Sequence, residues 1–307
     1  MAISLVNLVL VDDGKRAYGE HVRGAAMKLS EVRSLLIDMD FHPSRALGQN
    51  FLIDGNILDI LLEAADVSSR DQVLEVGPGL GTVTDGLLES ARRVVAVEKD
   101  HRLFDYLRAR FKGDARLELI CADMLDVDAG TLLKSGVNKV VSNLPYSAGS
   151  RILINLAMAE AAPDRIVVTV QQEVAERLAA TTDDDNYSKL SVWLQLDYDI
   201  ELVKTVSPTC FWPVPEVRSE IVTMTRRRWQ VLSRRERQTL YDLTTEAFTH
   251  RRKQVAAIFG RAEGALHIDP DETVRILGTL GLDARARPEN LSVEKWCELA
   301  KILTSGR

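Results

Sequence analysis

The sequence has few cysteines and lacks long apolar runs. Its three cysteines, Cys121, Cys210 and Cys297, stand alone and match no metal-ligating or redox spacing, so no metal site is predicted. Isolated cysteines of this kind are typical of a reducing compartment, and we expect a cytoplasmic location. No apolar run approaches the about 18 residues that a transmembrane helix needs, so no membrane partner is expected.

Negative charge predominates, but one segment departs from that balance. The chain carries a formal net charge of −6, whereas residues 225–261 hold ten Lys or Arg against three Asp or Glu, a local net charge of +7. A single charged run is typical of a solvated helix face. The contrast with the acidic remainder favours a surface that binds a phosphate backbone. The candidate RNA-binding residues are Arg226, Arg227, Arg228, Arg251, Arg252 and Lys253.

A glycine-rich stretch lies between a predicted strand and a predicted helix. The apolar run Gln72–Val76 predicts a buried strand, and Thr82–Ser90 can form a helix directly after the glycines. Gly77, Gly79 and Gly81 allow a sharp turn and a close approach to a ligand. This pattern alone could be a plain strand-to-helix turn, but it also predicts a cradle for a nucleotide-like cofactor.

Acidic residues around that stretch favour one kind of cofactor. Glu98 ends the next β-branched run, 21 residues after Gly77, where an acid can accept hydrogen bonds from ribose hydroxyls. Asp123 follows a third predicted strand, Leu117 to Ile120. Glu75, inside the first strand, suits a positively charged cofactor better than one carrying phosphates. We therefore expect S-adenosylmethionine, which has a sulfonium and an ammonium group.

The second candidate stretch, Asn143-Leu144-Pro145-Tyr146, follows a fourth predicted strand. Asn and Pro are turn formers, so a strand-ending turn is the simple alternative. The more specific interpretation is a clamp for a planar amine, in which the Asn143 side-chain oxygen and the Leu144 carbonyl accept its two N–H bonds. Pro145 offers no competing N–H. The ring of Tyr146 gives a nucleobase a face on which to stack.

These motifs resemble those of the small-subunit ribosomal RNA adenine N6,N6-dimethyltransferase family. The resemblance is carried by Asn143–Tyr146, by Gly48–Asp54 upstream, by the loop Phe211–Ser219 and by the basic run Phe248–Lys253. All four occur in the family's order, and the resemblance covers roughly residues 27–303.

The resemblance implies a Rossmann-like class I methyltransferase fold of α/β class. Residues 27–224 are expected to form the methyltransferase domain, and residues 225–307 a small all-α, basic, RNA-binding domain. Residues 1–26 are interpreted as a loose extension, with Met27 as a possible natural start. Leu190 to Leu196, Tyr198 to Val206 and Glu220 to Met224 are predicted to complete a seven-stranded, mostly parallel sheet with an antiparallel edge.

The family's activity would be dimethylation of N6 on two adjacent adenines in the 3′-terminal hairpin loop of small-subunit rRNA. The expected partner is that RNA or an immature small ribosomal subunit, bound by a monomer. Asn50 and Leu52 are implied to contact the cofactor with Glu75, Gly77, Gly79, Glu98, Asp123 and Asn143, and Phe211 is implied to form a second stacking wall opposite Tyr146. Three alternatives stay open: a large-subunit rRNA methyltransferase of the antibiotic-resistance type, a non-catalytic ribosome-assembly or transcription factor, and a small-molecule methyltransferase.

Overall fold

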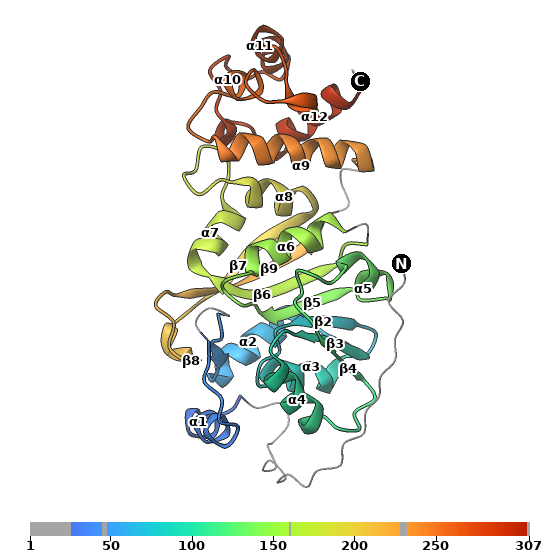
Figure 1. The fold of residues 1–307 in the computed structure, drawn as a ribbon, viewed down its shortest axis with the longest axis vertical. Helices are drawn as coiled ribbons and strands as arrows, with labels where there is room; N and C mark the ends of the chain where they lie inside the picture. The colour runs from blue at the N-terminus through green and yellow to red at the C-terminus, as the bar shows by residue number, and fades with distance from the viewer. Residues whose placement is uncertain (1–25, 45–47, 160, 228–231, 306–307) are drawn as a thin grey trace.

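One seven-stranded sheet organises the molecule. The computed structural model describes residues 26–44, 48–159, 161–227 and 232–305. The strand order is β4-β3-β2-β5-β6-β9-β7, in which the first five strands are parallel and β9 is antiparallel to both β6 and β7. The predicted α/β fold with a mostly parallel sheet is therefore confirmed (Figure 1). The strands are β2 Gln72–Val76, β3 Arg93–Glu98, β4 Leu117–Cys121, β5 Lys139–Asn143, β6 Arg165–Gln171, β7 Tyr198–Val206 and β9 Ser219–Arg226.

Helices cover both faces of the sheet because its central strands are apolar on both sides. Val73 and Val94 belong to a core shared with α1, α2, α3 and α4, whereas their neighbours Leu74 and Val95 belong to a core shared with α5, α6, α7 and α8. Alternation along each strand thus produces a three-layer arrangement. The helices are α1 Leu29–Asp38, α2 Gly55–Ala65, α3 Thr82–Ser90, α4 His101–Arg110, α5 Ala129–Lys134, α6 Gly149–Met158, α7 Gln172–Ala179 and α8 Lys189–Asp197.

One predicted strand is wrong. Leu190 to Leu196 form most of helix α8 rather than a strand. The helix is buried on nearly all sides between the sheet and the C-terminal helices, and its Trp193 donates a 3.1 Å hydrogen bond to Thr244. A short apolar run buried all around lacks the periodicity that distinguishes a helix from a strand.

The C-terminal part consists of helices. Ser233 and Glu236 form a capping box at the start of α9 (Arg234–Thr249), and Asp269 caps α11 (Pro270–Thr279). Between them lies α10 (Val255–Phe259). The last helix, α12, spans Val293–Ser305, and before it residues 288–290 form a 3₁₀ turn followed by extended backbone. None of the helices in the described residues is long and apolar enough to cross a membrane.

Helix α9 is joined to the sheet side of the molecule by packing and by charge. A single buried apolar cluster runs from the sheet through α8 into α9 and α12. At the end of α8, Arg237 of α9 donates two hydrogen bonds to Asp197, at 2.8 and 2.5 Å. A bidentate Arg–carboxylate pair fixes orientation as well as distance.

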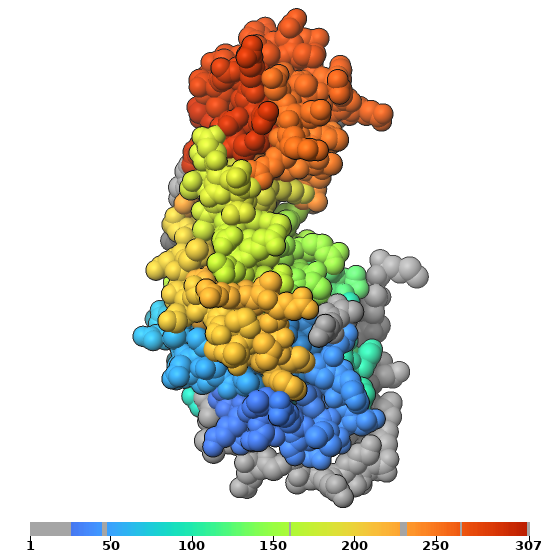
Figure 2. Space-filling model, turned by 90° about the vertical axis from the view of Figure 1, so that its left-hand side faces the viewer, coloured from blue at the N-terminus to red at the C-terminus, as the bar shows by residue number. Residues whose placement is uncertain are grey.

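A second, two-stranded sheet joins segments that lie far apart in the sequence. Strand β1 (Phe51–Leu52) pairs antiparallel with β8 (Phe211–Trp212), and the Ile53 N–H donates to the carbonyl of Cys210 at 2.9 Å. Figure 2 shows the loop that contains β8, in yellow and orange, lying against the blue N-terminal segments. This pairing places the Gly48–Asp54 motif beside the loop motif Phe211–Ser219.

Candidate active site

The glycine stretch forms a tight turn between β2 and α3, as predicted. Gly77, Gly79 and Gly81 all have positive φ, and that of Gly79 is +59°. A Cβ on Gly79 would lie 3.1 Å from the ring of Phe51. Because positive φ is strained for residues with a Cβ, the turn depends on glycine and brings Phe51 of β1 onto the loop.

Two buried carboxylates lie beside this turn. Glu75 is almost fully buried and accepts a 2.6 Å hydrogen bond from the hydroxyl of Thr84. Burial raises the pKa of Glu75 to about 8, although the Thr84 bond acts in the opposite direction. Burial also raises the pKa of Glu98, whose oxygens accept from the N–H groups of Gly79 at 3.0 Å and Asp100 at 2.8 Å. Glu98 therefore holds the glycine turn against the end of β3.

The third predicted acid, Asp123, is already paired. Its Oδ2 accepts from Lys99 Nζ at 2.7 Å and its Oδ1 from the Leu125 N–H at 2.9 Å. The hydrogen bond from Lys99 is the largest cause that lowers the pKa of Asp123, and Arg151 adds a favourable charge. The sequence analysis missed Lys99 and Arg151 as site residues. Lys99 could have been found from its position, because it directly follows Glu98 at the carboxyl end of a parallel strand.

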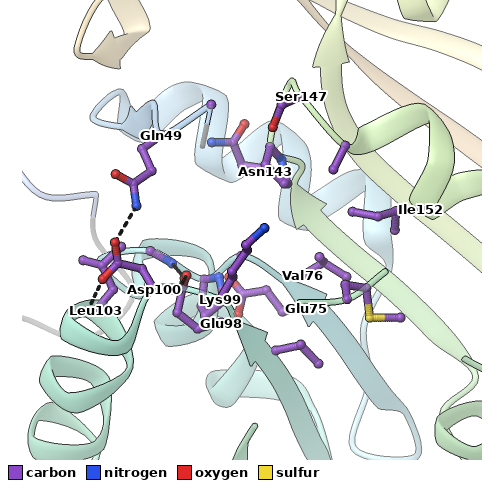
Figure 3. A pocket seen from close by; sticks show the side chains of 18 of the residues that line it. Gln49, Glu75, Val76, Glu98, Lys99, Asp100, Leu103, Asn143, Ser147 and Ile152 are labelled. Atoms are coloured by element: carbon purple, nitrogen blue, oxygen red, sulfur yellow. Dashed lines mark hydrogen bonds between the residues drawn. The ribbon is translucent and has the colours of Figure 1, made fainter. Parts of the chain in front are cut away.

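A cavity of about 280 Å³ opens between these groups. It lies at the carboxyl ends of the parallel strands, where open α/β sheets bind their ligands. Asn143 and Ser147 lie on one side of it, and Glu75, Glu98 and Lys99 lie on the other (Figure 3). The residues predicted to bind the cofactor all line it: Asn50, Leu52, Glu75, Gly77, Gly79, Glu98, Asp123 and Asn143.

The predicted clamp borders the same cavity. Asn143 is the last residue of β5, and its Nδ2 donates to the carbonyl of Asn50 at 2.9 Å. Its Oδ1 is buried and has no hydrogen-bond partner among the described residues. A buried acceptor without a donor is costly, so a ligand N–H would satisfy it. Pro145 also lines the cavity, and a Cβ on Gly77 would lie 3.6 Å from Pro145 Cδ, which puts clamp and cradle in contact.

The other two clamp residues point elsewhere. Leu144 is buried in the core, and its N–H donates to the Thr169 carbonyl at 3.1 Å. Tyr146 is half-buried, and its hydroxyl shares a hydrogen bond with Ser219. Both residues line a second, small cavity behind the clamp rather than the large one.

Phe211 does not reach the large cavity. Its side chain is fully buried in the core beneath β1, where it pairs with Leu52 across the two-stranded sheet. The expected placement of Phe211 as a ring opposite Tyr146 therefore does not hold in this structure, because strand pairing turns Phe211 inward. The neighbouring residue, Trp212, is partly exposed. The guanidinium of Arg33 lies over the ring of Trp212, 4.3 Å from the ring centre.

The predicted RNA-binding residues divide into two groups. Arg227 is paired with Asp199, and Arg251 donates to the carbonyls of residues 184 and 185. Arg226 is exposed, although one N–H donates to the Ala162 carbonyl at 2.8 Å. The side chains of Arg252 and Lys253 are exposed, whereas Arg228 lies outside the described residues.

The chain is similar to known proteins over most of its length. Residues 41–305 match the family described as "Ribosomal RNA adenine dimethylase". The chain belongs to the ribosomal RNA adenine dimethylase family. One similar protein is the "Ribosomal RNA small subunit methyltransferase A" of Natranaerobius thermophilus. It is 32% identical to this chain over 292 residues, and the alignment covers 89% of this chain and 95% of the relative.

Two solved structures resemble the fold of this rRNA adenine dimethylase. A dimethyladenosine transferase from Plasmodium falciparum is 25% identical with a TM-score of 0.68, over 81% of this chain and 95% of the other. A 23S rRNA methyltransferase, ErmE, is 25% identical with a TM-score of 0.60, over 83% of this chain and 99% of the other. Both share the fold of this chain, and only the second is named for a particular ribosomal RNA.

The cavity suits S-adenosylmethionine, the methyl donor expected from the sequence. Two buried carboxyl groups, Glu75 and Glu98, line the cavity, and each can ionise to balance a ligand that carries sulfonium and ammonium groups. The backbone of the glycine turn is open to close approach. Asp123 offers a carboxylate acceptor at the end of β4.

Proposed function

We propose that this protein is an rRNA adenine N6-dimethyltransferase that uses S-adenosylmethionine and acts in ribosome biogenesis. Its proposed target is two adjacent adenines in the 3′-terminal hairpin loop of small-subunit rRNA. The single observation that carries the proposal is the unpaired, buried Oδ1 of Asn143 beside a cavity that contains Glu75 and Glu98. An acceptor in that place needs an N–H donor, and an exocyclic adenine amine supplies two.

The cofactor-binding roles follow from position. When bound, S-adenosylmethionine supplies an electrophilic methyl group. Gly77 and Gly79 would leave backbone surface for its methionine part, and Glu98 would accept hydrogen bonds from its ribose hydroxyls. Asp123 would accept from the amine of its adenine, in exchange for the bond that Lys99 now makes. Asn50 and Leu52 would close the cavity from the side of β1.

The clamp residues would orient the amine that receives the methyl group. The amine is a poor nucleophile because its lone pair is delocalised into the ring. If Asn143 Oδ1 and the Leu144 carbonyl accept its two N–H bonds, the lone pair faces the cavity. Pro145 adds no N–H that could compete and restricts the backbone. No general base is required, because methylation acidifies the amine and its proton can leave to solvent.

The stacking role is assigned to Tyr146 alone. Stacking on an aromatic ring contributes about 1–3 kcal/mol per base, which offsets part of the cost of unstacking a loop adenine. Phe211 is fully buried here, so it could form a second wall only after leaving its place under β1. The proposal does not depend on that rearrangement.

RNA contacts are assigned to the exposed basic residues Arg226, Arg252 and Lys253. Phosphate contacts of this kind position the nucleic acid without reading its sequence. Arg227 and Arg251 hold parts of the protein together, so their contribution to RNA binding would be smaller. The proposal includes a monomer in the cytoplasm that acts on an immature small subunit.

The test is methyl transfer to ribosomal RNA. Purified protein is mixed with labelled S-adenosylmethionine and with small or large ribosomal subunits from cells that lack this gene, and the methylated positions are mapped by primer extension. We expect dimethyladenosine at two adjacent small-subunit adenines. Asn143→Ala should lower the rate at least a hundredfold, roughly the effect of removing a positioned transition-state contact, while Asn56→Ala, an exposed asparagine on α2, should have no effect.

The outcomes separate the alternatives. Methylation of large subunits alone would favour the antibiotic-resistance type, to which the similarity with the 23S rRNA methyltransferase also points. Binding to subunits without methylation would favour an assembly factor. A substrate whose binding is independent of salt would point to a small-molecule enzyme, because phosphate-backbone binding weakens steeply as salt increases. Any of these results would contradict the proposal.

A further inference from the structure

Ser219 ends the loop motif Phe211–Ser219 and touches the clamp from the start of β9, although it was not predicted to be a site residue. It is the first residue of β9, is fully buried, and lies between Gln171 of β6 and Val206 of β7 in the sheet. Its hydroxyl forms a hydrogen bond with the hydroxyl of Tyr146. The ladder on both sides of Ser219 makes it a rigid anchor, since its backbone is held by two neighbouring strands.

The backbone of Tyr146 is held in place as well as its hydroxyl group. A Cβ on Gly48 would lie 2.9 Å from the backbone nitrogen of Tyr146, and Gly48 has a φ of +66°. The Gly48 backbone therefore packs directly against the backbone nitrogen of Tyr146. Just before it, the Pro145 carbonyl accepts from the N–H groups of Ala148 at 3.1 Å and Gly149 at 3.0 Å. The backbone is thus held by local contacts, and the ring is held by Ser219.

Beside the ring lies a small void that is not filled by side chains. The small cavity behind the clamp borders Tyr146 and is lined by Gly149, Val170 and Val174 among others. Its volume is about 10 Å³, at the lower limit for holding one water. The void is too small to admit the ring, but packing beside it is incomplete, so the hydroxyl bond to Ser219 is the polar contact that sets the angle of the ring. Burial raises the pKa of Tyr146, which keeps its hydroxyl protonated and able to donate.

We propose that Ser219 is a positioning residue for methyl transfer, which acts by holding the Tyr146 ring in the orientation that stacks on the target adenine. This inference rests on the proposed function. Ser219 contacts neither the cavity nor the cofactor side of the site, so its effect is on the reacting geometry and not on cofactor binding. A small change in the angle of the base moves the amine relative to Asn143 and slows transfer.

The test is a double-mutant cycle on single-turnover methylation of small subunits. Ser219→Ala and Tyr146→Phe should each lower the rate roughly five- to tenfold, as loss of one hydrogen bond predicts. The double variant should be no slower than either single one, because both remove the same bond. The KM for S-adenosylmethionine should be unchanged in all three.

The matched control is Ser191→Ala, which removes an equally buried serine hydroxyl in α8 that bonds to the Arg177 carbonyl instead. It should lower the melting temperature without changing the rate. The inference is overturned if Ser219→Ala turns over at the wild-type rate, or if the losses from Ser219→Ala and Tyr146→Phe multiply. If Ser219→Ala unfolds, Tyr146→Phe at the wild-type rate overturns it equally. Wild-type protein that methylates no RNA overturns the proposed function, and this inference with it.

Discussion

Cofactor binding should release a proton from Glu75. The pKa of this buried carboxyl is raised to about 8, so about nine in ten molecules carry it protonated at pH 7. Glu75 lines the cavity, and a cationic ligand favours its ionised form. Ionising it at pH 7 costs about 1.4 kcal/mol, the equivalent of one pKa unit. The affinity for S-adenosylmethionine should therefore rise about tenfold between pH 7 and pH 9.

Isothermal titration calorimetry measures this directly. Titrations at pH 7 in buffers of different ionisation enthalpy should give a release of about 0.9 proton for each S-adenosylmethionine bound. Glu75→Gln should lose most of the release, weaken binding at pH 9, and flatten the pH dependence. Adenosine, a neutral ligand, serves as the control and should release almost none.

The reasoning fails if wild-type protein binds S-adenosylmethionine with the same affinity at pH 7 and pH 9. It fails equally if Glu75→Gln releases as many protons as the wild type, since the proton would then come from another group such as Glu98, whose pKa is also raised. The raised pKa has a second consequence. In the ligand-free protein this group stabilises the fold fully below its ordinary pKa, and that stability is lost as pH rises toward 8.

Three further predictions follow from contacts described above. Gly48→Ala should lower the rate of methylation and the melting temperature, because its φ of +66° and the 2.9 Å approach to the clamp leave no space for a methyl group; unchanged values would contradict that packing. Arg237→Ala should destabilise the protein by about 1–3 kcal/mol in urea unfolding, since it leaves a carboxylate at the end of α8 without its bidentate partner, and Arg235→Ala, on the exposed face of the same helix, is the control. Replacing both Arg252 and Lys253 by Ala should weaken RNA binding and reduce the slope of log affinity against log salt by about 1–2, with S-adenosylmethionine binding unaffected; an unchanged slope would remove these residues from the interface.

The sheet was predictable because its strands have strong local signals. β2 and α3 occur at the predicted residues, since β-branched runs bounded by glycine or by polar turns specify buried parallel strands. Helix α8 was not predictable in this way, because a segment buried on all sides shows neither a period of two nor one of 3.6. The boundary of α12 was set by a turn that composition does not reveal.

The cavity was predictable where chain order determines geometry. The residues at and just after the carboxyl ends of β2, β3, β4 and β5 meet at one edge because parallel strands end together. This places Gly77, Glu98, Asp123 and Asn143 around one space. Contacts between side chains were not predictable. The Lys99–Asp123 pair and the inward turn of Phe211 depend on rotamers and on the β1–β8 pairing, for which no short sequence pattern exists.

The two-residue strands β1 and β8 also restrict how the site can exchange its contents. The carbonyl of Asn50 accepts the hydrogen bond from the Asn143 side-chain amide, and Asn50 directly precedes β1. Backbone hydrogen bonds join β1 and the residue after it to the segment around Cys210. A motion that moves Asn50 away from Asn143 must either break the hydrogen bonds between β1 and β8 or move β8 together with β1. Any opening of the cavity on the Asn50 side is therefore coupled to the position of the β8 segment.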